Sequence, residues 1–171
     1  MFPRVNLGVN KMQVLMKRKR EGRTDYRKRF TLLKSGEPRL VVRPSNKGFV
    51  VQLVKYADNG DNVKVTVTRN TLIKLGIDVK GNSTPFCYLA GYYLGLRAKK
   101  SRIKKAILDT GLYRVSKGGR ISAVLRGSVD AGLNVPHDDS IFPSDDRISG
   151  KHLKNGEVDI ESMKKILEGN K

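Results

Sequence analysis

The pattern of apolar and polar positions predicts β-strands in the first half of the chain. Three runs rich in β-branched residues are separated by short turn-forming segments, and the runs cover residues 39–43, 49–56 and 62–68. Connections as short as 44–48 and 58–61 favour antiparallel hairpins. Because Val63, Val65 and Val67 alternate with polar residues, we expect these three valines to share one face of the third strand.

A helix is expected before the first strand. Thr24 or Asp25 can cap its start, and Gly36 can end it. The apolar residues at helical spacing, which would dock this helix on the rest of the protein, are Tyr26, Phe30 and Leu33. The cations that would point away from that docking face are Arg23, Arg27, Lys28 and Lys34.

A buried central helix is predicted by the stretch 86–96, which is apolar nearly all round. Thr84 can cap this helix, with Pro85 at the first helical position. Gly91 and Gly95 would let another backbone come close, and we expect the sheet to be the element that packs there.

The remaining segments complete an α/β pattern. We expect a short helix at 71–75, a fourth strand at 104–109, a helix from Ile121 to about Gly132, an edge strand or loop at 133–136, and a terminal helix at 159–168. Long helices before and after the fourth strand indicate a layered α/β domain with a mixed sheet. We divide the chain into a basic N-terminal arm (1–22), a globular domain (23–155) and a C-terminal helical tail (156–171).

The charge is large and unevenly distributed. The chain has 35 Lys and Arg against 16 Asp and Glu, a formal net charge of +19. Residues 1–47 hold fourteen cations and three acids, whereas residues 121–171 hold seven cations and nine acids. Like charges at this density repel one another in a protein alone in water, so a polyanionic partner is indicated, with nucleic acid the leading candidate. A solvated surface without a partner is the alternative.

Three segments offer groups that suit RNA. Residues 17–29 carry eight Lys or Arg and one Tyr, and guanidinium groups bind phosphate or stack on unpaired bases. The segment 43–47 combines Arg, Ser, Asn and Lys, although an ordinary hairpin turn explains it equally well. Lys117 and Arg120 flank two glycines before a predicted helix, where free N–H groups and cations can hold an anion.

Catalytic chemistry is poorly supported, and we expect no enzyme, no metal and no cofactor. Asp109 ends a strand, but the first strand supplies no acid beside it, whereas a two-metal nuclease needs several carboxylates together. His137 and His152 are isolated, and the acidic pairs at 138–139 and 145–146 are explained by solvation or helix capping. A metal-dependent RNA-processing enzyme and a general RNA chaperone remain the competing functions.

The cellular compartment is indicated by the cysteine content and by the length of the apolar runs. Cys87 is the only cysteine and lies in an apolar stretch, so we interpret it as a buried residue in a reducing compartment. No apolar run reaches the roughly 20 residues that span a bilayer. We therefore expect a cytosolic protein that binds no membrane.

Five ordered blocks closely resemble one protein family. The blocks are residues 19–26 (KREGRTDY), 38–43 (PRLVVR), 45–47 (SNK), 82–85 (NSTP) and 130–137 (DAGLNVPH). They resemble the 5S-rRNA-binding large-subunit ribosomal protein of the universal eighteenth family, and the similarity runs from about Lys17 to His152. The chain looks like the compact archaeal version, because the long insertion of eukaryotic relatives before the fourth strand is absent.

The resemblance implies an α/β fold of ribonuclease-H-like topology without nuclease activity, placed in the central protuberance of the ribosome, in the cytoplasm. It implies 5S rRNA, large-subunit rRNA and neighbouring ribosomal proteins as partners, with no DNA. The residues expected to contact 5S rRNA are Lys17, Arg18, Lys19, Arg20, Arg23, Thr24, Tyr26, Arg27, Lys28, Arg29, Arg43, Ser45, Asn46 and Lys47. Lys117 and Arg120 are expected as further RNA contacts.

Overall fold

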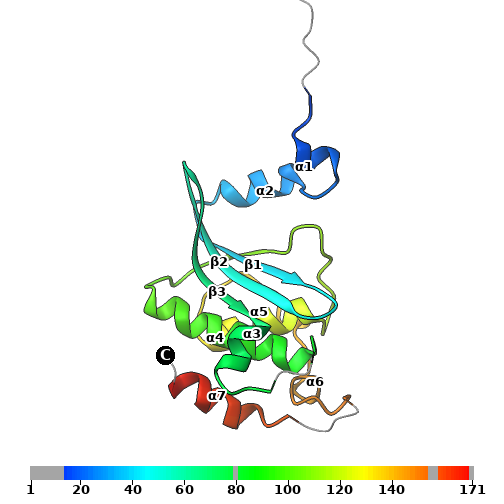
Figure 1. The fold of residues 1–171 in the computed structure, drawn as a ribbon, viewed down its shortest axis with the longest axis vertical. Helices are drawn as coiled ribbons and strands as arrows, with labels where there is room; N and C mark the ends of the chain where they lie inside the picture. The colour runs from blue at the N-terminus through cyan, green and yellow to red at the C-terminus, as the bar shows by residue number, and fades with distance from the viewer. Residues whose placement is uncertain (1–13, 79–80, 154–157, 170–171) are drawn as a thin grey trace, which may run out of the picture.

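A four-stranded mixed sheet organises the protein (Figure 1). The computed structural model describes residues 14–78, 81–153 and 158–169. The strands are β1 (Arg39–Pro44), β2 (Phe49–Ala57), β3 (Gly60–Thr68) and β4 (Ile107–Asp109). β1, β2 and β3 form the expected antiparallel meander, and β4 lies parallel to β1, giving the order β3-β2-β1-β4. The prediction of an α/β fold with a mixed sheet is confirmed.

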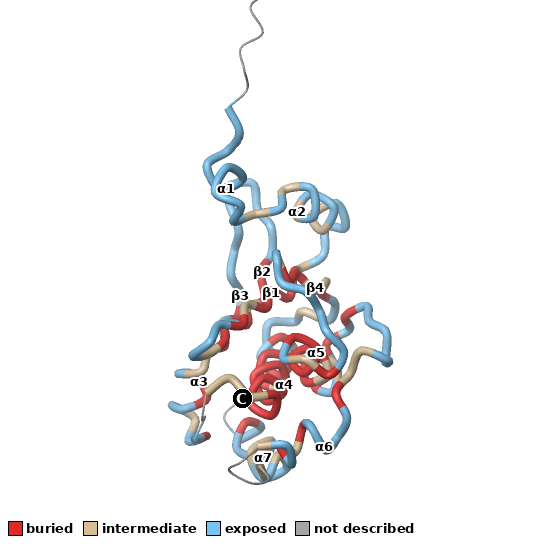
Figure 2. Tube along the Cα trace, turned by 90° about the vertical axis from the view of Figure 1, so that its right-hand side faces the viewer, coloured by how far each residue is buried: buried red, intermediate tan, exposed pale blue. Residues whose placement is uncertain are grey.

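Helices occupy both sides of this sheet. They are α1 (Lys17–Arg20), α2 (Tyr26–Leu33), α3 (Arg69–Lys74), α4 (Thr84–Lys100), α5 (Arg120–Asp130), α6 (Asp145–Ile148) and α7 (Ile160–Gly169), with a 3-10 turn η1 at Asp139–Ile141. Figure 2 shows the buried helices α4 and α5 on one side of the strands and the exposed helices α1 and α2 on the other. The protein therefore has an apolar side and a charged side.

Residue alternation along the strands explains the two sides. Leu40 of β1 pairs with Leu53 of β2, and both belong to the core packed against α4 and α5. The next residue of β1, Val41, pairs with Gln52 on β2 and with Asp109 on β4. Since successive side chains of a strand point to opposite faces, Asp109 lies on the face toward α2.

The strand register corrects one expectation about β3. Val65 pairs with Leu53 and Val63 pairs with Val54, so Lys64 is an extra residue in the ladder. Such a bulge interrupts the regular alternation of a strand. Val65 and Val67 are buried as expected, but Val63 is 46% exposed and does not share their buried face.

The close contact made by the glycines of α4 is with α5, which corrects the expectation that the sheet packs there. A Cβ on Gly91 would lie 2.0 Å from the carbonyl oxygen of Val124, and a Cβ on Gly127 would lie 2.1 Å from that of Tyr88. Glycines on both helices therefore let the two backbones approach. α4 is buried along most of its length, so the predicted central helix is confirmed.

Several predicted boundaries move by a few residues. The N-cap of α4 is Ser83 and not Thr84, with Pro85 in the first turn as expected. Only residues 107–109 of the predicted strand 104–109 join the sheet. Asn134, in the segment where an edge strand or loop was expected, forms a single parallel bridge with Lys105.

The C-terminal helix α7 packs against α4 and forms part of the core. Leu167 of α7 is completely buried, the hydroxyl of Tyr92 donates to Glu168 at 2.5 Å, and Lys164 lies over the rings of Tyr88 and Tyr92. The hydrogen bond to Glu168 and partial burial raise the pKa of Tyr92 to about 12. The predicted terminal helix is confirmed.

Candidate nucleic-acid interface

Helix α1 and the turn that follows it present cations to solvent. All four residues of α1 are exposed, and among the described residues 14–22 none is buried. Gly22, with φ +63°, reverses the chain after α1. Nε of Arg18 then donates to Oγ1 of Thr24 at 2.9 Å, which joins α1 to the start of α2.

Asp25 begins α2, which confirms one of the two predicted caps. Its carboxylate accepts hydrogen bonds from the backbone N–H groups of Arg27 at 2.9 Å and Lys28 at 3.1 Å. These two N–H groups would otherwise lack partners in the first turn of the helix. Gly36, with φ +69°, follows the end of the helix, as predicted.

The face by which α2 docks agrees in part with the predicted one. Tyr26 and Leu33 are half-buried as predicted, together with Leu32, but Phe30 is 62% exposed. Nζ of Lys28, expected to point away, donates to Oγ1 of Thr110 and to the carbonyl oxygen of Gly111, both at 3.0 Å. Polar contacts with the β4 end, in addition to apolar burial, therefore orient α2.

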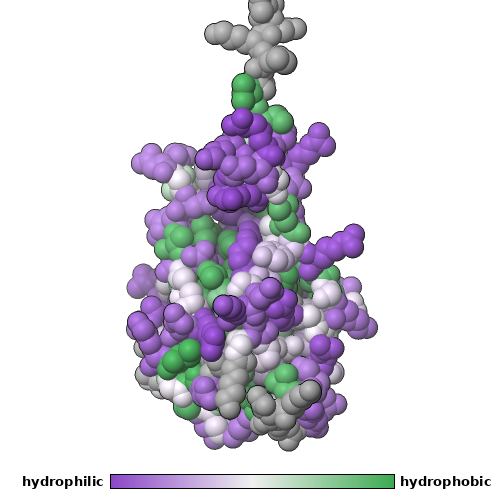
Figure 3. Space-filling model, turned by 45° about the vertical axis from the view of Figure 1, so that its right-hand side comes forward, coloured by the Kyte–Doolittle hydropathy of each residue, from purple (hydrophilic) through white to green (hydrophobic). Residues whose placement is uncertain are grey.

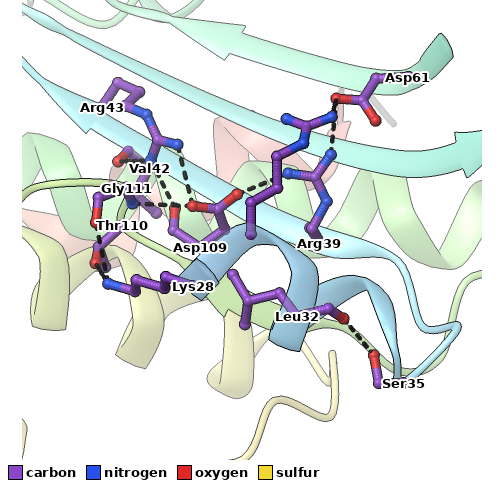
Figure 4. A network of polar contacts seen from close by, with 11 residues as sticks. Lys28, Leu32, Ser35, Arg39, Val42, Arg43, Asp61, Asp109, Thr110 and Gly111 are labelled. Carbon is purple, nitrogen blue, oxygen red and sulfur yellow. Dashed lines mark hydrogen bonds and ion pairs between the residues drawn. The ribbon is translucent and has the colours of Figure 1, made fainter. Parts of the chain in front are cut away.

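A chain of alternating charges fixes α2 to the sheet (Figure 4). Arg29 of α2 and Arg39 of β1 both contact the carboxylate of Asp61 at 2.8 Å. Arg39 also contacts Asp109 at 2.7 Å, and Arg43 contacts the other oxygen of Asp109 at 3.0 Å. Because each acid lies between two arginines, the network holds three guanidinium groups in place.

The arginines change the acidity of both carboxyl groups. Burial acts to raise the pKa of Asp109, but the hydrogen bond and positive charge of Arg43, helped by Gly111 and Arg39, outweigh it and lower the pKa below its ordinary 3.8. Burial also opposes the shift at Asp61, where hydrogen bonds from Arg29 and Arg39 lower the pKa. Both groups are therefore carboxylates at neutral pH.

A basic cleft lies where α1, α2 and the sheet meet. It has a volume of about 590 Å³, and its cationic lining consists of Arg18, Arg23, Lys28, Arg29 and Arg43. Leu112 and Tyr113, which we did not identify from the sequence, also line it and are largely exposed. In Figure 3 hydrophilic side chains gather over the end of the molecule that carries α1 and α2.

Arg43 belongs to this cleft and is directed away from the loop with which it was grouped. Its Nη1 donates to the carbonyl oxygens of Val42 at 2.9 Å and Asp109 at 2.7 Å. The sequence places Arg43 two residues before Ser45, but the pairing of its side chain with Asp109 assigns it to the network around α2.

The predicted loop 45–47 and the predicted Arg120 form a second group, whereas Lys117 lines a different pocket, with Arg126 and Phe142. Nη1 of Arg120 donates to the carbonyl oxygen of Ser45 at 3.4 Å, and Nδ2 of Asn82 donates to the same oxygen. Ser45 closes the turn by hydrogen bonds with Gly48, while Asn46 and Lys47 are exposed. Three segments far apart in the sequence therefore meet at one surface.

The acids considered as catalytic or metal-binding groups are engaged in hydrogen bonds or ion pairs within the protein, and Cys87 is buried. Both carboxylate oxygens of Asp109 accept hydrogen bonds within the protein. Oδ2 accepts from Arg39, and Oδ1 accepts from Arg43 and from the Gly111 N–H at 2.9 Å. Asp138 caps η1 and Asp145 pairs with Arg126. Among the residues that the structure describes, no three His, Cys, Asp or Glu side chains gather as metal ligands. Burial raises the pKa of the Cys87 thiol to about 12.

Of the two histidines considered as bases, His137 is held by its own loop. Its Nδ1 lies 2.6 Å from the carbonyl oxygen of Val135, and its ring packs on Phe142. His152 lies with Arg120 and Asn82 in the lining of a shallow surface pocket. In the described part of the chain, no helix has the length and apolar character needed to cross a bilayer.

An α/β domain that holds a cluster of exposed cations on a fixed helical segment is typical of RNA-binding proteins. Comparison with known proteins identifies the family within this class of RNA-binding proteins. Residues 10–104 and 97–138 match the family described as "Ribosomal large subunit proteins 60S L5, and 50S L18".

Proteins named large ribosomal subunit protein uL18 are similar over most of this chain. The one from Thermoplasma acidophilum is 48% identical over 161 residues, covering 92% of this chain and 98% of that protein. The one from Picrophilus torridus is 45% identical over 150 residues, covering 88% and 94%. The one from Methanococcus maripaludis is 44% identical over 145 residues, covering 85% and 75%.

The chain belongs to this family of large-subunit ribosomal proteins. It is a structural component of the ribosome, in the cytoplasm, and not an enzyme. The resemblance found in the sequence motifs is confirmed at the level of the family, as is its archaeal character.

Proposed function

We propose that this protein binds 5S rRNA and helps to anchor it in the central protuberance of the large subunit, in contact with large-subunit rRNA and neighbouring ribosomal proteins. The observation that carries the proposal is the α1–α2 segment, whose exposed cations stand on a helix that Arg29 and Lys28 attach to the sheet. The motif blocks that resemble the 5S-rRNA-binding family include this segment.

Within this interface, the predicted residues have different tasks. Arg20 and Arg27 are exposed and have no ion-pair partner among the described residues, and Arg23 pairs only with exposed Glu21. These three arginines are free to bind phosphates. Lys28, Arg29 and Arg43 are partly engaged inside the protein, so their task is to position the helix and to make the floor of the cleft positive.

The second group extends the surface. Asn46, Lys47 and Arg120 lie at the Ser45 turn, and Lys117 lies three residues before Arg120. The donors of these residues suit phosphate and base-edge contacts. The arrangement supports recognition of RNA shape, because two rigid groups of donors can match only certain spacings of phosphates. We also propose a division into a basic arm (1–22), a globular domain (23–155) and a tail (156–171), in which the arm and the first helix of the globular domain supply the phosphate contacts.

A competition binding assay tests the proposal. Purified protein is titrated with 5S rRNA, tRNA and duplex DNA at about physiological salt, and each titration is repeated over a range of salt concentrations. We expect a preference of about a hundredfold or more for 5S rRNA. If six to eight phosphates are neutralised, the plot of log affinity against log salt should have a slope of about −5 to −7.

Equal affinities for the three nucleic acids would contradict specific recognition and favour a general RNA chaperone. A slope near −1 would contradict the phosphate-binding role of α1 and α2. These two outcomes are independent, since one measures selectivity and the other measures the number of ionic contacts.

A further inference from the structure

An exposed apolar turn forms part of the wall of the basic cleft. Leu112 is 58% exposed and Tyr113 is 47% exposed, and both side chains line the cleft. Val115, two positions further along the chain, is also a large apolar residue at the surface. The cations of the cleft suit phosphates, but phosphate binding gives no reason for a leucine and a tyrosine at this place.

The backbone of this turn is held in place between β4 and α2 (Figure 4). The N–H of Tyr113 donates to the carbonyl oxygen of Thr110 at 3.1 Å, which closes the turn. The N–H of Gly111 donates to the carboxylate of Asp109 at 2.9 Å. Nζ of Lys28 donates to Oγ1 of Thr110 and to the carbonyl oxygen of Gly111, both at 3.0 Å. Leu112 and Tyr113 therefore stand on a fixed support.

Packing of the fold does not explain these two side chains. The apolar core of the described residues includes neither Leu112 nor Tyr113. Single exposed apolar residues are ordinary on protein surfaces, whereas apolar residues gathered in a cleft with a few polar groups are typical of a binding site. The turn therefore has the character of a surface that contacts a ligand.

The charges in the same cleft limit the kind of ligand. Arg18 and Arg23 are exposed and belong to the lining. Both acids of the lining are engaged within the protein, since Asp25 caps α2 and Asp109 pairs with arginines. The cleft is therefore positive, and it suits a ligand that carries a negative charge next to an apolar surface.

A nucleotide with an unpaired base has this combination of properties. Its phosphate binds guanidinium groups, and the face of its base stacks on an aromatic ring. A base inside a duplex is stacked between its neighbours and offers no free face. The cleft, with a volume of about 590 Å³, lies within the range of about 300–1,000 Å³ that is usual for pockets that bind small molecules. It is therefore large enough for one nucleotide.

We propose that Leu112 and Tyr113 bind an unpaired base of the RNA in the basic cleft, with Arg18 and Arg23 on the phosphates beside it. The inference rests on the proposed binding of 5S rRNA by α1 and α2. It adds a contact with a base, so the turn at 110–113 distinguishes an RNA that offers an unpaired nucleotide from a continuous duplex.

Affinities for two RNAs test the proposal. The unmodified protein and Tyr113→Ala are titrated with 5S rRNA purified from Thermoplasma acidophilum and with a fully paired RNA duplex of similar length. We expect Tyr113→Ala to lose about tenfold in affinity for 5S rRNA, because one base loses its stacking partner. We expect equal affinities of the two proteins for the duplex. The salt slope should not change, since the removed ring carries no charge.

Three further variants separate stacking from other effects. Tyr113→Phe keeps the ring and should bind 5S rRNA within about twofold of the unmodified protein. Tyr113→Leu keeps apolar bulk without an aromatic face and should bind as weakly as Tyr113→Ala, even if the alanine variant is poorly folded. Tyr56→Ala is the matched control, because Tyr56 is 52% exposed on β2 and does not line the cleft. This control should bind 5S rRNA as the unmodified protein does.

Chemical probing of the bases supplies a second measurement. Complexes with 5S rRNA are formed at saturating protein and treated with dimethyl sulfate and kethoxal, which modify accessible base edges. We expect at least one unpaired base that is protected by the unmodified protein to become reactive in the Tyr113→Leu complex. Identical patterns of reactivity in the two complexes would overturn the proposal.

The binding results separate this inference from the function on which it rests. Equal affinities of Tyr113→Leu and Tyr56→Ala for 5S rRNA would overturn the inference, while a preference of the unmodified protein for 5S rRNA over tRNA would still support the proposed function. An equal loss on 5S rRNA and on the duplex would also overturn the inference, because no unpaired base would be involved. If the unmodified protein has no preference for 5S rRNA, the proposed function fails and the inference fails with it.

Discussion

Asp109 at the end of β4 pairs with Arg39 of β1 at 2.7 Å, and both side chains are almost completely buried, with exposures of 8% and 3%. The two residues lie on the sheet face opposite the main apolar core, under α2 (Figure 4). Arg39 in turn reaches Asp61, and Asp61 holds Arg29 of α2. The pair therefore connects the folded sheet to the helix that carries the proposed RNA contacts.

Asp109→Asn is expected to destabilise the fold strongly. The amide keeps the shape but removes the negative charge, which leaves the buried guanidinium of Arg39 without its nearest counter-ion. Breaking a buried ion pair in this way costs about 3 to 5 kcal/mol. The free energy of unfolding from urea titration measures the loss. Glu37→Gln, at an exposed acid, is the control, with an expected change within about 0.5 kcal/mol. A loss below about 1 kcal/mol at Asp109 would show that the pair is dispensable.

The same network predicts a loss of stability in acid. The pKa values of Asp61 and Asp109 are lowered in the folded protein relative to 3.8. A depressed folded-state pKa gives a stabilisation that is complete above about pH 5 and disappears as the pH falls below 3.8 toward the folded-state pKa. The difference in unfolding free energy between the unmodified protein and Asp61→Asn should thus be constant from pH 7 to pH 5 and shrink below pH 4. A difference that stays constant down to pH 3 would contradict the assignment.

Local signals predicted most of the elements correctly. The strands of the meander, the Asp25 cap, the glycine after α2 and the buried central helix all depend on residues close together in the sequence. The predicted ends of the helices and strands were less accurate, because local residues do not decide between similar alternatives. Ser83 and Thr84 are both suitable caps by type, and the length of β4 depends on its partner strand.

The docking geometry could not be predicted, because it depends on residues distant in the sequence. Tyr26, Phe30 and Leu33 are spaced to share one face of a helix. However, Lys28 donates a hydrogen bond to Thr110, 82 positions away, and Phe30 is exposed. The side chain of Arg43 likewise forms an ion pair with Asp109 and is directed away from the neighbouring loop 45–47. The bulge at Lys64 has no clear signal in a strand that alternates regularly.

The contact between α4 and α5 makes glycine essential at two positions. Gly91→Ala or Gly127→Ala would place a Cβ within about 2 Å of a backbone carbonyl oxygen of the other helix. The helices would have to separate, at a cost of about 1 to 3 kcal/mol or more. Gly169→Ala is the matched control, since a Cβ there meets nothing within 4 Å in α7. Thermal unfolding should show lower melting temperatures for the first two variants and no decrease for the control. Equal melting temperatures would contradict the close packing of α4 on α5.

The separation between supporting and contacting cations gives a final prediction for α1 and α2. Arg20, Arg23 and Arg27 are exposed, so replacing all three by Ala should leave the melting temperature nearly unchanged. Loss of three guanidinium contacts should weaken 5S rRNA binding by about 2 to 5 kcal/mol. Arg29→Ala is the contrasting variant, because it removes a partner of Asp61 and should lower stability as well as binding. Binding by filter retention and melting by circular dichroism, measured on the same preparations, distinguish the two effects. If the triple variant melts at a much lower temperature, these arginines support the fold and the proposed interface must lie elsewhere on the protein.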